Sequence, residues 1–252
     1  MTTFVSDIQS YLDEYLRIVE ISDSAEALNG LQVDHDAEVT RLAAAVDACQ
    51  ATIDRAAELE ADFLLVHHGL FWGGLEPLTG RHGRRIRRLM NAGIALYSAH
   101  IPLDLHPELG NNAILADKLR LIDREWFGDY KGERLGVSGT LSMPLHDLVA
   151  AVGEIVGSDP QTLAFGPSVT SRVGIISGGG GDMIAQARDA GVDTYITGEG
   201  KHHSYFDAEE SGLNVVYAGH YATETLGVKA LTEHISNKYD LPWDFLDHPT
   251  GL

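Results

Sequence analysis

The fold is indicated by the stretch at residues 94–104, Ile-Ala-Leu-Tyr-Ser-Ala-His-Ile-Pro-Leu-Asp, which passes from apolar residues into His100 and Asp104. A second stretch at residues 214–224, Asn-Val-Val-Tyr-Ala-Gly-His-Tyr-Ala-Thr-Glu, follows the same order. Each begins as a short apolar run typical of a buried β-strand. Each continues with a tyrosine, two small residues, a histidine and, four residues later, a carboxylate. This shared order predicts an internal repeat built from two related units.

Similar apolar runs recur along the chain and alternate with stretches of helical character. The predicted strands lie at residues 42–46, 63–66, 94–97, 173–176, 194–196 and 215–217. Short β runs separated by helices are typical of an α/β fold with parallel sheets. We therefore predict an α/β protein of two related lobes with mixed, largely parallel sheets.

The boundary between the lobes is predicted where glycine and proline are frequent, at residues 127–168. We expect a first lobe at residues 1–126 and a second at residues 127–224. Part of a C-terminal helix at about residues 225–252 is expected to pack back on the first lobe.

The composition is strongly acidic, with a formal net charge of −19 and only 18 Lys and Arg residues in 252. Such a surface repels itself unless salt screens the charges, which favours a protein adapted to high salt. An acidic enzyme without that adaptation is the alternative. The same charge disfavours binding to nucleic acid, because that binding depends on cationic contacts with phosphate.

Cysteine and membrane chemistry are limited by the sequence. Cys49 is the single cysteine, so any metal must be held by histidines and carboxylates. No apolar run approaches the ~20 residues needed to cross a membrane, and the N-terminus lacks the pattern of a signal peptide. We expect a cytoplasmic protein that makes no membrane contact.

Histidines and carboxylates gather where predicted strands end. The carboxyl ends of parallel strands meet at one edge of a sheet, and positions i and i+4 of a following helix share a face. Imidazole and carboxylate are the ligands that zinc, iron and manganese use, and a carboxylate can bridge two ions. The residues concerned are His67, His68, His100, Asp104, His220 and Glu224.

The adjacent pair His67 and His68 leaves two possibilities. On an extended backbone, neighbouring side chains point to opposite sides, so the two rings would reach different ions or one would turn away. A kink at the end of the strand would relax that constraint.

These residues belong to a set of motifs that resembles a known family. Together they are similar to the Nif-three-like, or YbgI-type, proteins, also called GTP cyclohydrolase 1 type 2 homologs. The resemblance covers nearly the whole chain. The motifs, in order, are Asn29-Gly30-Leu31-Gln32, His67-His68-Gly69, Ala99-His100 with Leu103-Asp104, Gly198-Glu199 with His202-His203, and Gly219-His220 with Glu224.

The resemblance implies a homohexamer of two-lobed subunits with two divalent ions (Zn, Fe or Mn) between the lobes. It places the ligands at His67, His68, Asp104, His220 and Glu224. It also implies that His100 orients a ligand or a water molecule rather than binding an ion. Here Ile101 and Pro102 stand where many members have a Thr-Asn pair, and Glu199 stands where many have aspartate. Neither change removes an implied ligand.

Five further residues are weaker candidates for the site. Glu199 and His203 would move protons or position a substrate, as His100 would. Phe71, Trp72 and His202 would contact the substrate, although packing is the ordinary role of the two aromatic rings and a polar loop is the ordinary setting of His202.

Two other features have competing interpretations. The run Gly178–Gly181 could cradle a phosphate, but a tight structural turn is the favoured interpretation because the P-loop lysine is missing. The arginines between Arg81 and Arg88 form a basic cluster in an acidic chain. They could meet a substrate phosphate or nucleic acid, but pairing with acids of the surface or of a neighbouring subunit is favoured.

The sequence therefore predicts a metal-dependent hydrolase that acts on a nucleotide-like or phosphorylated small molecule. Paired divalent ions make hydroxide available near neutral pH and stabilise developing negative charge. The alternative is a metal-binding or scaffold hexamer without turnover. Five ligands are too few to fill two coordination spheres, which favours an open site and an enzyme.

Overall fold

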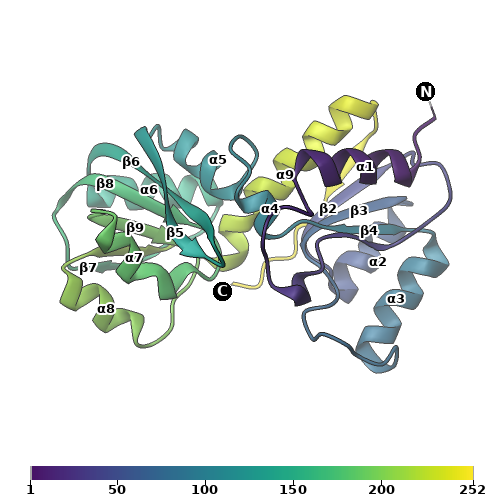
Figure 1. Ribbon diagram of the computed structural model, residues 1–252, viewed down its shortest axis with the longest axis horizontal. Coiled ribbons are helices and arrows are strands. Elements are labelled where there is room, and N and C mark those ends of the chain that lie inside the picture. The colour runs from purple at the N-terminus through teal and green to yellow at the C-terminus, as the bar shows by residue number, and fades with distance from the viewer. Residues whose placement is uncertain (1, 252) are drawn as a thin grey trace. The chain divides into compact units, whose positions relative to one another are not determined.

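The computed structural model describes residues 2–251 and divides them into two compact units (Figure 1). The first unit contains residues 2–103 and 228–248, and the second contains residues 104–227 with 249–251. Within residues 2–251 no helix combines the length and the apolar character needed to cross a membrane.

The first unit is built on a five-stranded sheet in the order β1-β4-β3-β2-β11. β1 pairs antiparallel with β4, and the other neighbours are parallel. The strands are β1 (Gly30–Val33), β2 (Leu42–Asp47), β3 (Phe63–His68), β4 (Ala95–Ser98) and β11 (Trp243–Phe245).

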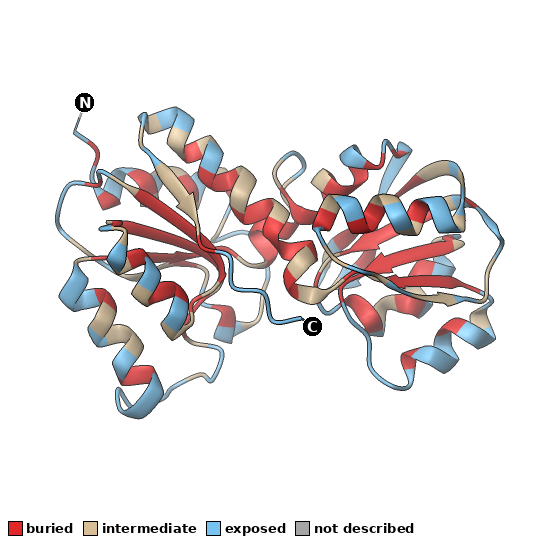
Figure 2. Cartoon of the chain, turned by 180° about the vertical axis from the view of Figure 1, so that it is seen from behind, coloured by how far each residue is buried: buried red, intermediate tan, exposed pale blue. Residues whose placement is uncertain are grey.

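Helices cover both faces of this sheet (Figure 1). One face carries α2 (Gln50–Glu58) and α3 (Gly80–Ala92), and the other carries α1 (Val5–Tyr15) and the later part of α9 (His220–Tyr239). The central strands are buried on both sides, which explains why they read as continuous apolar runs. Figure 2 shows buried strands between helices whose outer faces are exposed.

The second unit is built on a six-stranded sheet in the order β5-β6-β8-β9-β10-β7. Two of its pairings, β8 with β9 and β9 with β10, are parallel, and the other three are antiparallel. The strands are β5 (Ile122–Tyr130), β6 (Glu133–Pro144), β7 (Gln161–Ala164), β8 (Val169–Ile176), β9 (Thr194–Thr197) and β10 (Asn214–Tyr217).

The helices of the second unit also lie on both faces of the sheet. α5 (Asn111–Lys118) and α6 (Leu145–Val156) pack on one face, and α7 (Ile184–Asp189) and α8 (Ser204–Ser211) on the other (Figure 1). Short turns complete the chain: the 3-10 helices η1 (Ala25–Ala27) and η2 (Gly180–Met183), and the single turn α4 (Ile101–Asp104).

The predicted α/β fold is confirmed, and each of the six predicted strands is present. Both sheets are mixed, but only the first is largely parallel. The difference comes from the β5–β6 hairpin, which the sequence did not predict because its glycines suggested turns. Gly136 lies inside β6, where a Cβ would come within 2.6 Å of the Phe127 ring. Glycine here permits close packing within a strand.

The division into units differs from the predicted boundary. The first unit ends at Leu103, so residues 104–126 belong to the second unit. The reason is apolar packing, because Leu115 of α5 and two leucines between α5 and β5, Leu119 and Leu121, belong to the core that also contains residues of β6 and α6. The segment from Val228 to His248 belongs to the first unit.

The two units share a β-α-β-α-β core. Strand pairing aligns the two cores with a shift of one residue from the alignment of their sequences. Phe63 pairs with Ala95 in the first unit, and Thr194 pairs with Asn214 in the second. This register aligns Ile101 with His220, the first residues of α4 and α9. The sequence comparison had aligned His100 with His220, because both follow a tyrosine by three residues.

Candidate metal-binding groups

Three histidines of the first unit form one cluster. His67 and His68 end β3, and His100 follows β4 on the neighbouring strand. Each ring has one nitrogen, a possible metal ligand, that lies within 4.8 Å of such a nitrogen in each of the other two rings. The ring centroids of His67 and His68 are 4.8 Å apart. The two adjacent rings therefore lie together rather than on opposite sides of the strand.

Each ring of this cluster is held through its Nδ1 atom. His67 donates to the backbone oxygen of Ala99 at 2.9 Å. His68 donates to Asp47 Oδ1 at 3.0 Å, and His100 donates to Asp23 Oδ2 at 2.9 Å. Since these acceptors require a proton on Nδ1, Nε2 carries the lone pair of the neutral ring. This is the pattern by which proteins orient histidine ligands of metals.

Asn29, in the first of the family motifs, supports His100. Asn29 Oδ1 accepts a hydrogen bond from the His100 backbone N–H at 2.7 Å, and Asn29 Nδ2 donates to Asp23 at 2.7 Å. Burial alone would raise the pKa of Asp23, but its hydrogen bonds with His100 and Asn29 lower it. Asp23 is therefore an ionised partner for the imidazole.

Gln32 fixes the loop that follows the histidine pair. Its Oε1 accepts from the Leu70 backbone N–H at 2.8 Å, and its Nε2 donates to Leu28 O at 2.9 Å. A Cβ on Gly69 would fall 2.1 Å from the Gln32 amide. The motifs at residues 29–32 and 67–69, far apart in sequence, thus contact each other directly.

Of the two aromatic candidates, Trp72 is the one that contacts the cluster. Its ring meets His68 and His100 edge to face, with centroids 5.7 and 4.9 Å away. Trp72 is 38% exposed, so part of its ring remains accessible to solvent. Phe71 instead packs against His82 and the core of the first unit.

A second group forms at the start of α9 in the second unit. His220 and Glu224 lie on one face of the helix, as predicted, with Nε2 and Oε1 3.1 Å apart. His220 Nδ1 donates to Glu199 Oε1 at 2.9 Å. Burial would lower the pKa of His220, but the two carboxylates raise it to about 9. Glu199 therefore positions His220, as Asp47 positions His68.

Asp104 is a buried carboxylate of the second unit. Its Oδ1 accepts from Asn111 Nδ2 at 2.7 Å and from Ser177 Oγ at 3.2 Å. Asn111 in turn accepts from the Gly227 N–H of α9 at 2.7 Å. These bonds keep the carboxylate in place, and Ser177 connects it to the glycine-rich turn beside His220.

Gly178 leaves the space that the Glu224 carboxylate fills. Its φ is +63°, and a Cβ would lie 2.1 Å from Glu224 Oε1 and 3.2 Å from His220 Nε2. Its N–H donates to Thr223 Oγ1 at 2.9 Å. The run Gly178–Gly181 is therefore a tight turn that admits buried side chains, in keeping with the favoured structural interpretation.

Comparison with known proteins assigns this arrangement to a family. The family profile described as Duf34/NIF3 (NGG1p interacting factor 3) matches residues 3–250. The chain belongs to the Duf34/NIF3 family. It is 46% identical to a "GTP cyclohydrolase 1 type 2 homolog" of Halobacterium salinarum, covering 98% of this chain and 99% of the relative. A protein of the same name from Deinococcus radiodurans is 45% identical, covering 98% and 94%.

A solved structure extends the comparison to three dimensions. The crystal structure of the protein TTHA1606 from Thermus thermophilus is 42% identical, with a TM-score of 0.90, over 99% of this chain and 100% of that one. The resemblance seen in the sequence motifs is thus confirmed, as is the two-sheet fold of the Duf34/NIF3 proteins.

The donor set of this Duf34/NIF3 chain fits divalent metal ions. Imidazole and carboxylate suit zinc, iron and manganese. Four rings are oriented through Nδ1, and the missing Cβ of Gly178 makes room for a buried carboxylate. The structure therefore contains histidine and glutamate groups that could hold a metal ion.

Two predicted residues lie on the exposed surface of the second unit, in other contacts. His203 Nε2 is 3.4 Å from Asp182 Oδ1, beside the Lys201–Asp182 ion pair. His202 packs edge to face against Phe206. These contacts involve neither His220 nor Glu224, so the roles predicted for the two histidines gain no support from the structure.

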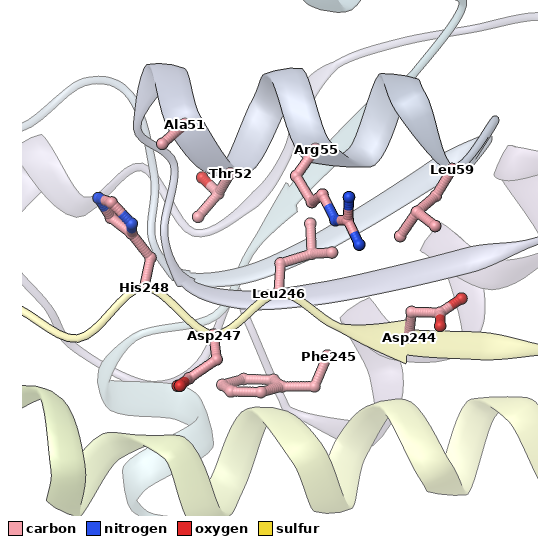
Figure 3. A pocket seen from close by; sticks show the side chains of 9 residues that line it. All are labelled: Ala51, Thr52, Arg55, Leu59, Asp244, Phe245, Leu246, Asp247 and His248. Atoms are coloured by element: carbon pink, nitrogen blue, oxygen red, sulfur yellow. The ribbon is translucent and has the colours of Figure 1, made fainter.

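A surface pocket of about 400 Å³ lies elsewhere in the first unit (Figure 3). It is formed by α2 and the segment from β11 onward, and Leu59 and Leu246 supply apolar lining. Two of its charged residues, Arg55 and Asp244, pair with Glu58 and Arg41 respectively. None of the histidines described above lines this pocket, so it is separate from the candidate metal-binding groups.

Sequence reasoning missed the residues that hold the histidines. Asp23 and Asp47 are ordinary acids in an acidic chain, and no spacing rule connects them to His100 and His68. Asn29 carried a usable signal, because it lies within one of the family motifs. Its contact with His100 depends on the pairing of β1 with β4, which was not predicted.

Proposed function

We propose that this Duf34/NIF3 protein binds two divalent ions through His67, His68, Asp104, His220 and Glu224, and that it is a metal-dependent hydrolase. The observation that carries the proposal is the orientation of the histidines by Nδ1 donation to oxygen. That these five residues bind the same ions is supported by family membership and by the motif spacing.

The residues divide into ligands and positioning groups. His67 and His68 would bind through Nε2, and Asp104 and Glu224 would offset the charge of two nearby ions. Asp47 and Glu199 position the rings of His68 and His220. His100 is also held through Nδ1, so its Nε2 would accept a hydrogen bond from a water molecule beside the other two rings.

Bound divalent ions would supply Lewis acidity, which makes water nucleophilic near neutral pH. The chain itself would orient the substrate and exclude water from the imidazoles. Trp72 is suited to the second task, because its ring contacts both His68 and His100. Its accessible part would also stack on a planar group.

The substrate class proposed is a nucleotide-like or phosphorylated small molecule. Relatives with 45–46% identity bear the name GTP cyclohydrolase 1 type 2 homolog, which supports a nucleotide-like ligand. Assembly as a homohexamer in the cytoplasm is proposed on the family resemblance.

Metal analysis tests the site directly. We expect two ions per chain in purified protein, and loss of both from a variant that combines His67→Ala with Glu224→Ala. His146→Ala is the matched control, because that side chain is 82% exposed and lies outside the proposed site. Unchanged metal content in the double variant would refute the site. The loaded protein is then assayed against nucleotides and phosphoesters at high salt, where absence of any turnover would favour the non-catalytic alternative.

A further inference from the structure

The helix α3 concentrates positive charge that the rest of its unit does not neutralise. It carries five arginines and no acidic residue, within a chain of net charge −19. Arg88 donates to Asp54 Oδ1 of α2 at 3.1 Å. Within residues 2–251, the other four arginines form no ion pair. An unneutralised basic helix in so acidic a protein indicates an anionic ligand.

Arg85 differs from the exposed arginines of the helix. Its side chain is partly buried, and its Nε–H is buried with no hydrogen-bond acceptor among the described residues. A buried donor is normally satisfied, so this atom indicates an acceptor supplied from outside the chain. Burial and the charge of Arg81 lower the pKa of Arg85, although the guanidinium remains charged.

Arg85 lies near the edge of the sheet that carries the histidine cluster. Asp47 and Cys49, at the end of β2 and the start of α2, are among its electrostatic neighbours. Asp47 is the residue that accepts the hydrogen bond from His68 Nδ1. A group bound by Arg85 would therefore lie near the oriented imidazoles.

The arginines next to Arg85 on the helix strengthen this placement. Arg81 and Arg84 stand one turn and one residue before it, and both are electrostatic neighbours of the Arg85 guanidinium. Guanidinium groups form paired, charge-assisted hydrogen bonds with phosphate oxygens. A phosphate with several negative charges would relieve the mutual repulsion of this group.

We propose that Arg85, assisted by Arg81 and Arg84, binds a phosphate group of the substrate beside the histidine cluster. This proposal rests on the proposed function only in placing the reacting bond of the substrate at the metal site. The binding of phosphate by Arg85 does not depend on it. It assigns the substrate to phosphorylated compounds rather than to neutral planar ones.

The test measures binding of pyrophosphate by calorimetry to protein stripped of metal with a chelator, at one fixed salt concentration. We expect Arg85→Gln to weaken binding about tenfold or more, since it removes a charged hydrogen-bond donor. Arg87→Gln is the matched control, because it changes the net charge equally from an exposed position on the same helix. We expect it to change binding less than about twofold.

A third variant separates charge from hydrogen bonding. Arg85→Lys keeps the charge but lacks Nε, so we expect binding between those of the wild type and Arg85→Gln. Equal losses in Arg85→Gln and Arg87→Gln, or wild-type binding in Arg85→Gln, would overturn the proposal. So would a loss of subunit association in Arg85→Gln with pyrophosphate binding intact, because that would assign α3 to a protein interface. Metal content, measured separately, reports on the proposed metal site alone.

Discussion

The β-α-β-α-β cores of the two units show the same backbone carrying different side chains at matching places. In the first unit, Asp62 accepts hydrogen bonds from the backbone N–H groups of Thr40 and Arg41, just before β2. In the second, Asp193 accepts from Ser171 and Arg172 in the same way. The aspartates precede β3 and β9, so each anchors the outer parallel strand of its core.

At the opposite end of the strands the units differ. Asp47 lies opposite His68 in the first sheet, and Gly178 accepts a hydrogen bond from the Glu199 N–H in the second. The first unit therefore has a carboxylate on one strand and a histidine on the next. The second has a glycine and a carboxylate, and its histidine comes from the first turn of α9.

The different placement of histidine and carboxylate in the two units shows how a repeated scaffold supports different ligands. Each unit forms a carboxylate–histidine pair at the carboxyl edge of its sheet, at 3.0 Å in the first and 2.9 Å in the second. The chemistry of the pair is the same in both units, while the positions of its two members change. Because Gly178 has no side chain, the Glu224 carboxylate fits beside it. The helix α4 of the first unit carries no glutamate at the matching place.

The largest effect is expected where the units differ most. Gly178→Ala should displace Glu224 and strain a left-handed residue, lowering the free energy of unfolding by about 3 kcal/mol and reducing metal content. Gly157→Ala is the control, since its φ is +74° with no atom within 4 Å of the added Cβ. It should cost about 1 kcal/mol through the backbone alone, with metal content unchanged. Equal effects in chemical denaturation would show that the space beside Glu224 is unimportant.

The carboxylate–histidine pairs should be equivalent in function. Asp47→Ala and Glu199→Ala should each weaken metal binding about 10–100-fold, because each removes the group that orients a histidine. Competition with a chromophoric chelator measures the affinity. Asp182→Ala is the control for the second unit, since its carboxylate pairs with the exposed Lys201. If only one pair affects binding, the two units do not contribute equally to the ions.

The shared anchors should matter to stability rather than to metal binding. Asp62→Ala and Asp193→Ala should each lower the free energy of unfolding by about 1–2 kcal/mol, because several hydrogen bonds to a partly buried charge are lost. Asp193 accepts from two hydroxyls, those of Thr170 and Thr194, whereas Asp62 accepts from one, that of Thr40, so the loss at Asp193 should be the larger. Denaturant titration of the two variants checks the order, and a reversed order would contradict this account of the repeat.

Salt is expected to stabilise both units, and its effect on stability should be the smallest of those predicted here. Screening should raise the melting temperature between low and molar salt, because the 37 acidic residues outnumber the 18 Lys and Arg residues and repel one another. Differential scanning fluorimetry in potassium chloride measures the change. A flat or falling curve would indicate an acidic protein without salt adaptation.

The strands and the helical pairing of His220 with Glu224 could be predicted because each depends on local spacing. The strand end at Tyr217 followed directly from an apolar run, whereas β3 extends two residues beyond the predicted end at residue 66, to His68. The β5–β6 hairpin could not be predicted, since Gly136 has a close neighbour that only the folded sheet supplies. The alignment of His100 with His220 failed for a related reason. Tyrosine marks the same place in both sequences, but strand pairing, not residue type, sets the register.

The contacts that orient the histidines were the least predictable part of the site. Asp23 reaches His100 across 77 positions of sequence, and Asp47 reaches His68 across 21. Such pairs are set by which strands become neighbours. Family motifs revealed the histidines themselves, but they gave no signal for either aspartate.

The Nδ1 hydrogen bonds also affect the thermodynamics of ion capture. A histidine that is loose in the ion-free protein loses rotamer freedom when it binds, and that loss reduces affinity. In this protein the rings of His67, His68 and His100 are ordered by folding itself. The entropy of ordering them is therefore part of the folding equilibrium, and ion binding should be accompanied by little further loss of side-chain motion.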